Sequence, residues 1–227
     1  MTVQTASPVR FHWVRAVALV SGLVSAAANC CFVLRALSAS RLDPLSSLIS
    51  ELEVPGQPAS AFFRLSSVLS GVAAVVLAAT LSRRLPPGRL GLAGCWALAL
   101  FGVAGALDAS IPMDCAPSAS AVCFRAEEQG PTSWPYQAHT WFDVAGTVAL
   151  LGCLWLLGRH LSAHAGWRAT AVGGRVGFRW MAAASALLTV MSIWYLPGVG
   201  LVQRLQVVAA SVWLVVLAVD QARQPAD

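Results

Sequence analysis

The sequence predicts an all-α protein, a six-transmembrane helix bundle with two long extracytoplasmic loops. Of its 227 residues, 57% are hydrophobic and 11% are charged, and the mean hydropathy is +0.68. Soluble domains carry about 25% charged residues, so most of this chain belongs in a lipid bilayer. The apolar residues fall into six blocks, each near the ~20 residues that cross a bilayer as a helix. We therefore treat residues 1–227 as a single integral membrane domain.

The six expected spans follow one another along the whole chain. Their approximate bounds are 16–34, 61–81, 90–109, 139–158, 178–197 and 200–219. The first resembles a signal peptide, because Ala26 to Ala28 offers small residues for cleavage. Its apolar run continues to Leu34, past any such cleavage point. The first span is therefore expected to remain as a membrane anchor.

The arginines set the expected orientation, since all fifteen basic residues are Arg. Ten would lie on the side of the N-terminus: Arg10, Arg15, Arg83, Arg84, Arg89, Arg159, Arg168, Arg175, Arg179 and Arg223. The other five are Arg35, Arg41, Arg64, Arg125 and Arg204. Because cytoplasmic loops carry the excess of Arg, both termini are expected to be cytoplasmic. The basic residues behind the net charge of +5 are thus explained by membrane orientation. This charge therefore does not indicate a nucleic-acid partner.

Two outer loops, 36–60 and 110–138, are long enough to carry function. The first is expected to contain a short amphipathic helix, with Asp43 as its N-cap and Pro44 at its first position. Its apolar face would be Leu45, Leu48, Ile49 and Leu52. Its polar side would carry Ser47, Ser50 and Glu51. This helix would either lie on the bilayer or the bundle, or line a site with its polar side.

Four charged residues are expected at one depth, just below the outer ends of their spans. They are Arg64, Asp108, Asp143 and Arg204. A charge at the bilayer centre costs roughly 2.5 to 3.5 kcal/mol, and such groups usually face the bundle interior and pair with one another. We therefore predict a polar cluster beneath the outer loops. His139 would join it, because it precedes Asp143 by four residues and shares its helix face.

Two interpretations of this cluster are open. In the first, it is an ion-pair clasp that holds four helices in register. In the second, it forms the floor of an outward-facing pocket, where Arg64 and Arg204 grip an anionic head group and Ser50 contributes a hydroxyl. A carboxyl group could also act there as an acid or a base. The candidate catalytic residues are Glu51, Asp108, Asp114, Asp143 and His139.

The cysteines and histidines add one expected bond and no metal site. Cys115 and Cys123 share an outer loop and are expected to form a disulfide in an oxidising exterior. A catalytic zinc usually takes three protein ligands, but only His139 lies on the outer side. His160 and His164 lie one helical turn apart on the inner side, without a third ligand nearby. Nucleotide-binding glycine motifs are absent from the sequence as well, so no cofactor is expected.

Both outer loops carry runs that resemble signatures of a known family. The first is Asp43-Pro44, Ile49-Ser50-Glu51-Leu52, Gln57-Pro58 and Phe63-Arg64. The second is Pro112-Met113-Asp114-Cys115-Ala116-Pro117-Ser118, Cys123, Glu127-Glu128, Ser133-Trp134 and Gln137-Ala138-His139. Over about 16–219 the chain resembles the bacterial membrane proteins of domain-of-unknown-function family 998. The resemblance implies a six-helix protein of the bacterial plasma membrane without an assigned activity. Glu53 departs from it, since Gly is expected there.

Three function classes follow from these observations. The first is a non-enzymatic membrane protein that binds a lipid or small amphiphile, or that serves as a subunit of a larger assembly. The second is a membrane-embedded enzyme that uses carboxylate acid/base chemistry on a lipid or isoprenoid substrate, for example an acid-initiated cyclase. The third, a transporter, is disfavoured because the spans show no inverted repeat. An apolar cavity with carboxyl groups directed into it would favour the enzyme.

Overall fold

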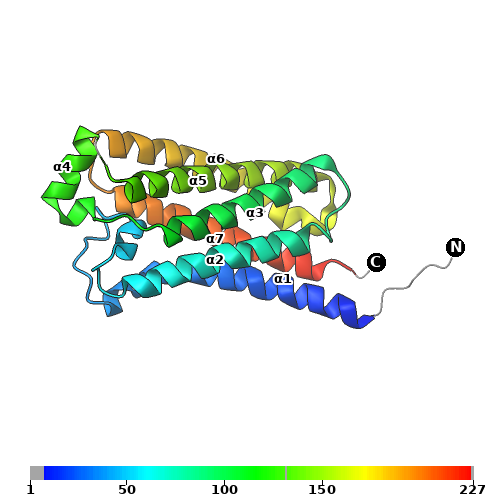
Figure 1. The fold of residues 1–227 in the computed structure, drawn as a ribbon. Coiled ribbons are helices and arrows are strands. Elements are labelled where there is room, and N and C mark those ends of the chain that lie inside the picture. The colour runs from blue at the N-terminus through cyan, green and yellow to red at the C-terminus, as the bar shows by residue number, and fades with distance from the viewer. Residues whose placement is uncertain (1–7, 131, 226–227) are drawn as a thin grey trace.

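Six long helices run side by side in the computed structural model, which describes residues 8–130 and 132–225 and holds no strand within them (Figure 1). They are α1 (Pro8–Asn29), α2 (Ser60–Leu81), α3 (Arg89–Ser110), α5 (Trp134–His160), α6 (Arg168–Ile193) and α7 (Val199–Arg223). The shorter α4 spans Ala121–Gln129. Five 3-10 helices lie in the connections: η1 (Cys31–Leu37), η2 (Ile49–Glu53), η3 (Pro117–Ala119), η4 (Leu161–Ala163) and η5 (Ala165–Trp167). The predicted all-α fold is confirmed.

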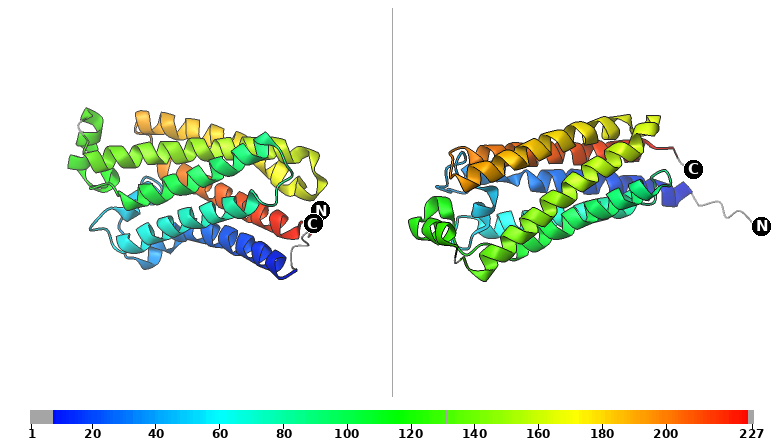
Figure 2. Two further views of the ribbon diagram at one scale, coloured as in Figure 1. Left: turned by 45° about the vertical axis from the view of Figure 1, so that its right-hand side comes forward. Right: turned by 90° about the horizontal axis from the view of Figure 1, so that it is seen from above.

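The long helices form a closed ring. Each packs against its neighbours in the order α1, α2, α3, α5, α6 and α7, and α7 packs against α1 again (Figure 2). Fully buried leucines from four of these helices, including Leu77, Leu98, Leu154 and Leu214, fill the interior. We call the end that carries segments 30–59 and 111–133 the loop end. The opposite end, where α1 begins and α7 ends, is the terminal end (Figure 1).

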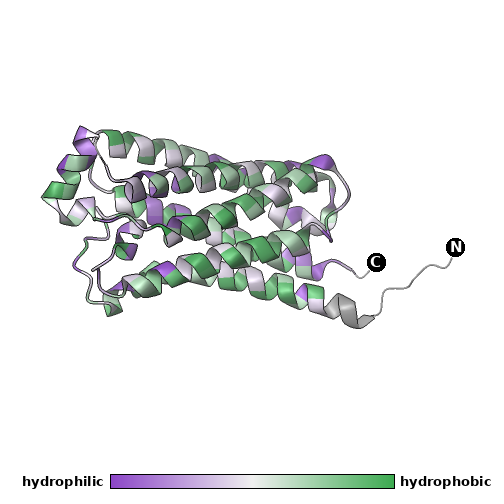
Figure 3. Cartoon of the chain, in the orientation of Figure 1, coloured by the Kyte–Doolittle hydropathy of each residue, from purple (hydrophilic) through white to green (hydrophobic). Residues whose placement is uncertain are grey.

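The outer surface of the ring is apolar, as a bilayer requires. Large side chains such as Trp96, Leu65 and Val148 are exposed along it, and hydrophilic residues concentrate toward the two ends (Figure 3). Five helices are long and apolar enough to cross a membrane, and a bent pair, Trp13–Asn29 with Cys31–Leu37, makes a sixth. The protein is therefore an integral membrane protein.

Several span boundaries differ from the sequence prediction, among them the starts of α6 and α5. Helix α6 begins at Arg168, ten residues before the expected start, because the segment assigned to a polar connection is helical. Arginine favours helices, and its long side chain reaches water from inside a span, so Arg168, Arg175 and Arg179 do not interrupt the helix. Helix α5 begins at Trp134, where the Ser133 hydroxyl accepts a hydrogen bond from the amide of Tyr136 at 3.3 Å.

The loop-end prediction of one amphipathic helix over 43–52 is wrong. Asp43 does cap a turn, since its carboxylate accepts hydrogen bonds from the Leu45 amide at 3.2 Å and the Ser46 hydroxyl at 2.6 Å. The turn does not continue as a helix because a carbonyl of the turn is hydrogen-bonded to α7 instead. The Gly200 amide donates to the Leu45 carbonyl at 2.9 Å. The chain resumes as the separate η2. The first expected span also ends early, with a bend of 42° after Asn29.

Candidate functional site

A group of polar side chains lies where α2, α3, α5 and η2 meet at the loop end. We call it the acid-histidine cluster: Glu53, Arg64, Ser67, Asp108 and His139. The histidine is buried, and its Nδ1 lies 3.0 Å from Oδ1 of Asp108 and 3.3 Å from the Asp108 backbone carbonyl. This contact joins α3 to α5. It also orients the imidazole ring, so the cluster contains a paired acid and base.

Glu53 is the most buried acid of the cluster, with 4% of its surface exposed. Its Oε1 accepts a hydrogen bond from the Ser67 hydroxyl at 2.5 Å, while Oε2 has no hydrogen-bond partner in the described part of the chain. Burial raises the pKa of Glu53 to about 7, against the opposing effects of Ser67, His139 and Arg64. Near neutral pH this carboxyl group therefore exchanges its proton readily.

Arg64 and Asp143, the other two residues predicted for this region, do not contact the His139 and Asp108 pair through hydrogen bonds. Arg64 donates from Nε to the carbonyl oxygen of Ala109 at 3.2 Å, which ties α2 to the end of α3. Asp143 is exposed on α5 and interacts electrostatically with Asp108 and His139. Its carboxylate makes no hydrogen bond to any other described residue. Asp143 thus lies at the edge of the acid-histidine cluster, on the outer surface of the bundle.

Arg204 belongs to a different contact set. Its Nη1 donates to the carbonyl oxygens of Ser47 at 2.7 Å and Gly200 at 2.9 Å, and its guanidinium lies 5.8 Å from the Phe32 ring centroid. The expected convergence of Arg64, Asp108, Asp143 and Arg204 is therefore wrong. The physical reason is that the first loop folds over α7 and places backbone carbonyls around the guanidinium.

Glu51 connects the two loops. It is buried, and its Oε1 accepts a hydrogen bond from the Leu48 amide at 2.9 Å. Its Oε2 accepts from the Ser118 amide at 3.0 Å and from the Ser118 hydroxyl. The carboxylate of this candidate acid is thus fully engaged by loop backbone and hydroxyl donors. Ser50, beside it on η2, is half-buried and makes no side-chain hydrogen bond to a described residue.

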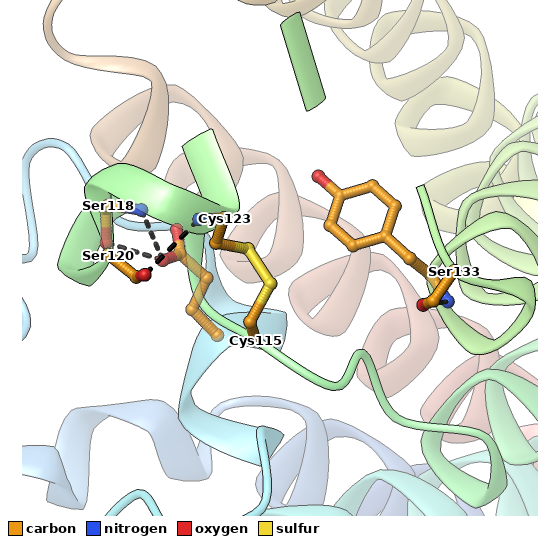
Figure 4. The surroundings of a disulfide bond; sticks show 7 residues. Cys115, Ser118, Ser120, Cys123 and Ser133 are labelled. Carbon is orange, nitrogen blue, oxygen red and sulfur yellow. Dashed lines mark hydrogen bonds between the residues drawn. A yellow bond between two sulfur atoms is a disulfide. The ribbon is translucent and has the colours of Figure 1, made fainter. Parts of the chain in front are cut away.

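The predicted disulfide between Cys115 and Cys123 is confirmed, and it closes the segment that presents Ser118 to Glu51 (Figure 4). Within that segment Ser120 is the N-cap of α4. Its hydroxyl accepts a hydrogen bond from the Cys123 amide at 3.3 Å. Asp114, the remaining candidate, is exposed immediately before Cys115. The structure therefore places Asp114 apart from the acid-histidine cluster.

Two pockets lie away from the place that the sequence suggested. One of about 430 Å³ lies beside the connection between α2 and α3, and one of about 230 Å³ lies beside the start of α6. Both are at the terminal end, so neither corresponds to the expected outward-facing pocket. No group of three or more His, Cys, Asp or Glu side chains suited to a metal ion occurs among residues 8–130 and 132–225.

Sequence reasoning missed Glu53 and Ser67 as members of the site. Glu53 was noted only for its departure from a family pattern. A usable signal was present, since Glu53 stands directly between Leu52 and Val54, and an acid among apolar residues is buried only where a partner receives it. Ser67 follows Glu53 by fourteen residues, and no local pattern reveals such a contact.

These features define an integral membrane helix bundle with a buried acid-histidine cluster beneath two loops, the second of which contains a disulfide. A family model described as "Protein of unknown function (DUF998)" matches residues 12–220, and the chain belongs to this family. No curated protein and no solved structure matches the chain.

The raised pKa of Glu53 predicts a pH-dependent stability. Its value of about 7 in the folded chain lies above the ordinary value of 4.5, so the protonated carboxyl group stabilises the fold. That contribution is complete below about pH 4.5 and is lost as pH rises through about 7. It amounts to on the order of 3 kcal/mol. Thermal unfolding in detergent should therefore show a midpoint that falls between pH 5 and pH 8.

The variant Glu53→Gln is expected to remove this fall and to be more stable than the original chain at pH 8. Glutamine keeps an oxygen for the Ser67 hydroxyl and carries no charge. The matched control is Glu128→Gln, which changes an exposed acid on α4. A pH dependence that persists unchanged in Glu53→Gln would contradict the assignment.

Proposed function

We propose that the protein binds the polar head of a lipid or small amphiphile at the acid-histidine cluster. The observation that carries the proposal is the free Oε2 of buried Glu53, beside the His139 and Asp108 pair. A buried polar atom without a partner is costly, and a ligand that donates a hydrogen bond would remove this cost. Membrane lipids are the molecules that surround this part of the chain.

The charges of the site favour a head group with donors, such as an amine or a hydroxyl. Three carboxylates, those of Glu53, Asp108 and Asp143, stand against His139 and Arg64. The Arg64 guanidinium already binds the Ala109 carbonyl, and Arg204 is held by two carbonyls elsewhere. An anionic head group, which the two arginines had suggested, would meet an excess of negative charge here.

The orientation of the protein is part of this proposal. Arginines concentrate near the terminal end, and the disulfide lies at the loop end. Cytoplasmic retention of Arg and formation of disulfides outside the cytoplasm both favour cytoplasmic termini. We therefore place the acid-histidine cluster near the outer face of a bacterial plasma membrane, as the resemblance implies.

A second function is favoured by the protonation of Glu53. A carboxyl group with a pKa of about 7 in an apolar surrounding can donate a proton at neutral pH. The protein would then be a membrane-embedded enzyme that acts on a lipid or isoprenoid substrate, for example an acid-initiated cyclase. Glu53 would donate a proton to the substrate. The His139 and Asp108 pair would then accept a proton from the cyclised cation as the product forms.

Lipids that co-purify with the chain test the first function. The chain would be extracted in a mild detergent, and bound lipids would be quantified by mass spectrometry. Amine-bearing phospholipids should be enriched over choline-bearing ones added during extraction. Asp108→Asn and Glu53→Gln should lower this enrichment about tenfold, the effect of losing one charge-assisted hydrogen bond.

The control for this test is again Glu128→Gln, which removes an acid at the same end and should keep the enrichment. Size-exclusion profiles establish that each variant is folded. Equal enrichment in all variants would refute the binding site. A lipid species that forms in cells with the original chain and disappears with Glu53→Gln would instead establish the enzyme.

A further inference from the structure

A second polar pocket lies at the terminal end, far along the bundle from the acid-histidine cluster. It has a volume of about 230 Å³ and lies between the connection after α5 and the first two turns of α6. Its polar lining consists of Ser162, His164, Arg168 and Arg175. Alanine and valine side chains, including Val172, complete its wall. None of the described residues that line it is acidic.

The two arginines present their charges to the same side of α6. They are seven residues apart, so they share a helix face and lie about 10 Å apart along the axis. Both are exposed, and neither guanidinium forms a hydrogen bond or ion pair with another residue that the structure describes. Each therefore has a full set of donors available to a ligand.

The surroundings leave this positive charge unbalanced. Among residues 8–130 and 132–225, the acid on the helices beside α6 at this end is Asp220 on α7, which is buried and turned into the bundle. Its Oδ2 accepts hydrogen bonds from the amide and the hydroxyl of Thr170, each at 2.8 Å. The other charged groups on the helices beside α6 at this end are basic, namely Arg159 and Arg223. The pocket thus selects for an anion.

The pocket also lies at the depth of lipid head groups. Helix α6 has 26 residues and is about 39 Å long, whereas the hydrocarbon core measures about 30 Å. Its first two turns, which carry Arg168 and Arg175, therefore extend into the head-group layer. The outer face of α6 is largely exposed, so acyl chains can lie against it directly below the pocket.

We propose that this pocket binds the phosphate of an anionic phospholipid head group. Guanidinium groups bind phosphate oxygens through paired hydrogen bonds, and basic pockets at the cytoplasmic side of membrane helices are suited to such lipids. Two other polar side chains form the rim: the Ser162 hydroxyl, which donates to the carbonyl oxygen of Arg159 at 2.8 Å, and the His164 ring, whose Nδ1 lies 3.3 Å from the carbonyl oxygen of His160. Val172 contacts the start of the acyl region.

Lipid nanodiscs test the proposal. The full chain would be placed in nanodiscs that contain equal amounts of phosphatidylglycerol and phosphatidylcholine, and the lipids retained after mild detergent release would be counted by native mass spectrometry. Phosphatidylglycerol should be enriched about tenfold in the original chain, because its phosphate binds the two arginines without the cationic choline that phosphatidylcholine carries beside the same phosphate. The double variant Arg168→Gln with Arg175→Gln should lose this preference.

Two further variants make the result specific. Arg223→Gln removes one exposed arginine at the same end and should keep the preference. Lysine at positions 168 and 175 should give an intermediate value, because charge remains while paired hydrogen bonding is lost. Preference that persists in the double glutamine variant, or that falls equally in Arg223→Gln, would overturn the site.

Inorganic phosphate distinguishes a lipid from a free ion. If millimolar sodium phosphate displaces no phosphatidylglycerol and leaves the unfolding midpoint unchanged, the acyl chains contribute to binding, as the proposal requires. If phosphate alone stabilises the chain as much as phosphatidylglycerol does, and only when both arginines are present, the pocket binds a free anion and the lipid assignment is wrong.

Discussion

Replacing Gly102 by alanine is expected to disrupt the packing of α2 against α3. A Cβ atom at Gly102 would stand 2.4 Å from the carbonyl oxygen of Gly71, and one at Gly71 would stand 2.3 Å from that of Gly102. Both obstacles are backbone atoms, so the helices themselves must separate. Close approach at small residues drives helix association in membranes. We expect a loss of about 3 kcal/mol, at the upper end for overpacking, measured as a lower unfolding midpoint in detergent.

Gly105 provides the matched control, since it lies one turn further along α3 and a Cβ there meets nothing within 4 Å. Gly105→Ala should leave the midpoint unchanged or raise it, because alanine favours helix over glycine by about 1 kcal/mol. If both variants lose stability equally, the contact between α2 and α3 does not limit the fold.

Replacing Glu51 by alanine is expected to detach the two loops from each other. The change removes the acceptor for the Leu48 amide and for both donors of Ser118, and it leaves buried donors unsatisfied. Hydrogen bonds to a charged group contribute about 1.5 to 3 kcal/mol each. We expect a loss of about 3 kcal/mol in unfolding free energy, together with faster protease cleavage in segments 36–59 and 111–133.

Glu51→Gln should recover only part of this loss, since glutamine accepts through one oxygen where the glutamate accepts through two. Glu128→Ala, at an exposed acid on α4, controls for the removal of charge and should have little effect. An intact loop end in Glu51→Ala would show that the disulfide alone holds the second loop. Because its oxygens are already engaged, Glu51 acts here as a positioning residue.

Much of the fold could be predicted from the sequence because length and hydropathy determine a membrane span. Helices α2 and α3 begin and end within a residue of the expected positions. The start of α6 was missed because its arginines look like a polar connection, although each lies on a face that water or head groups reach. The break after Asn29 was also missed, since it depends on packing rather than on composition.

The candidate site was less predictable because its contacts join segments that are distant in sequence. The sequence placed Asp108 and His139 in one cluster, Asp108 from its expected depth and His139 because it precedes Asp143 by four residues, but their direct contact is seen only in the structure. Arg204 was assigned to the same group for the same reason, but depth does not fix which side of a helix faces which neighbour. Only the folded structure shows that its guanidinium donates hydrogen bonds to the carbonyl oxygens of Ser47 and Gly200.

The contact between α1 and α7 means that the ring closes only after α7, the last of its six long helices in chain order, has been synthesised. At Gly22 the two helices approach so closely that a Cβ atom would stand 2.3 Å from Ala218 Cβ. During translation the face of α1 that carries Gly22 therefore has no helix packed against it in the bilayer until α7 is made. The nascent chain has a seam that stays open until α7 packs against α1, and until then this seam is open to lipid, to chaperones or to another copy.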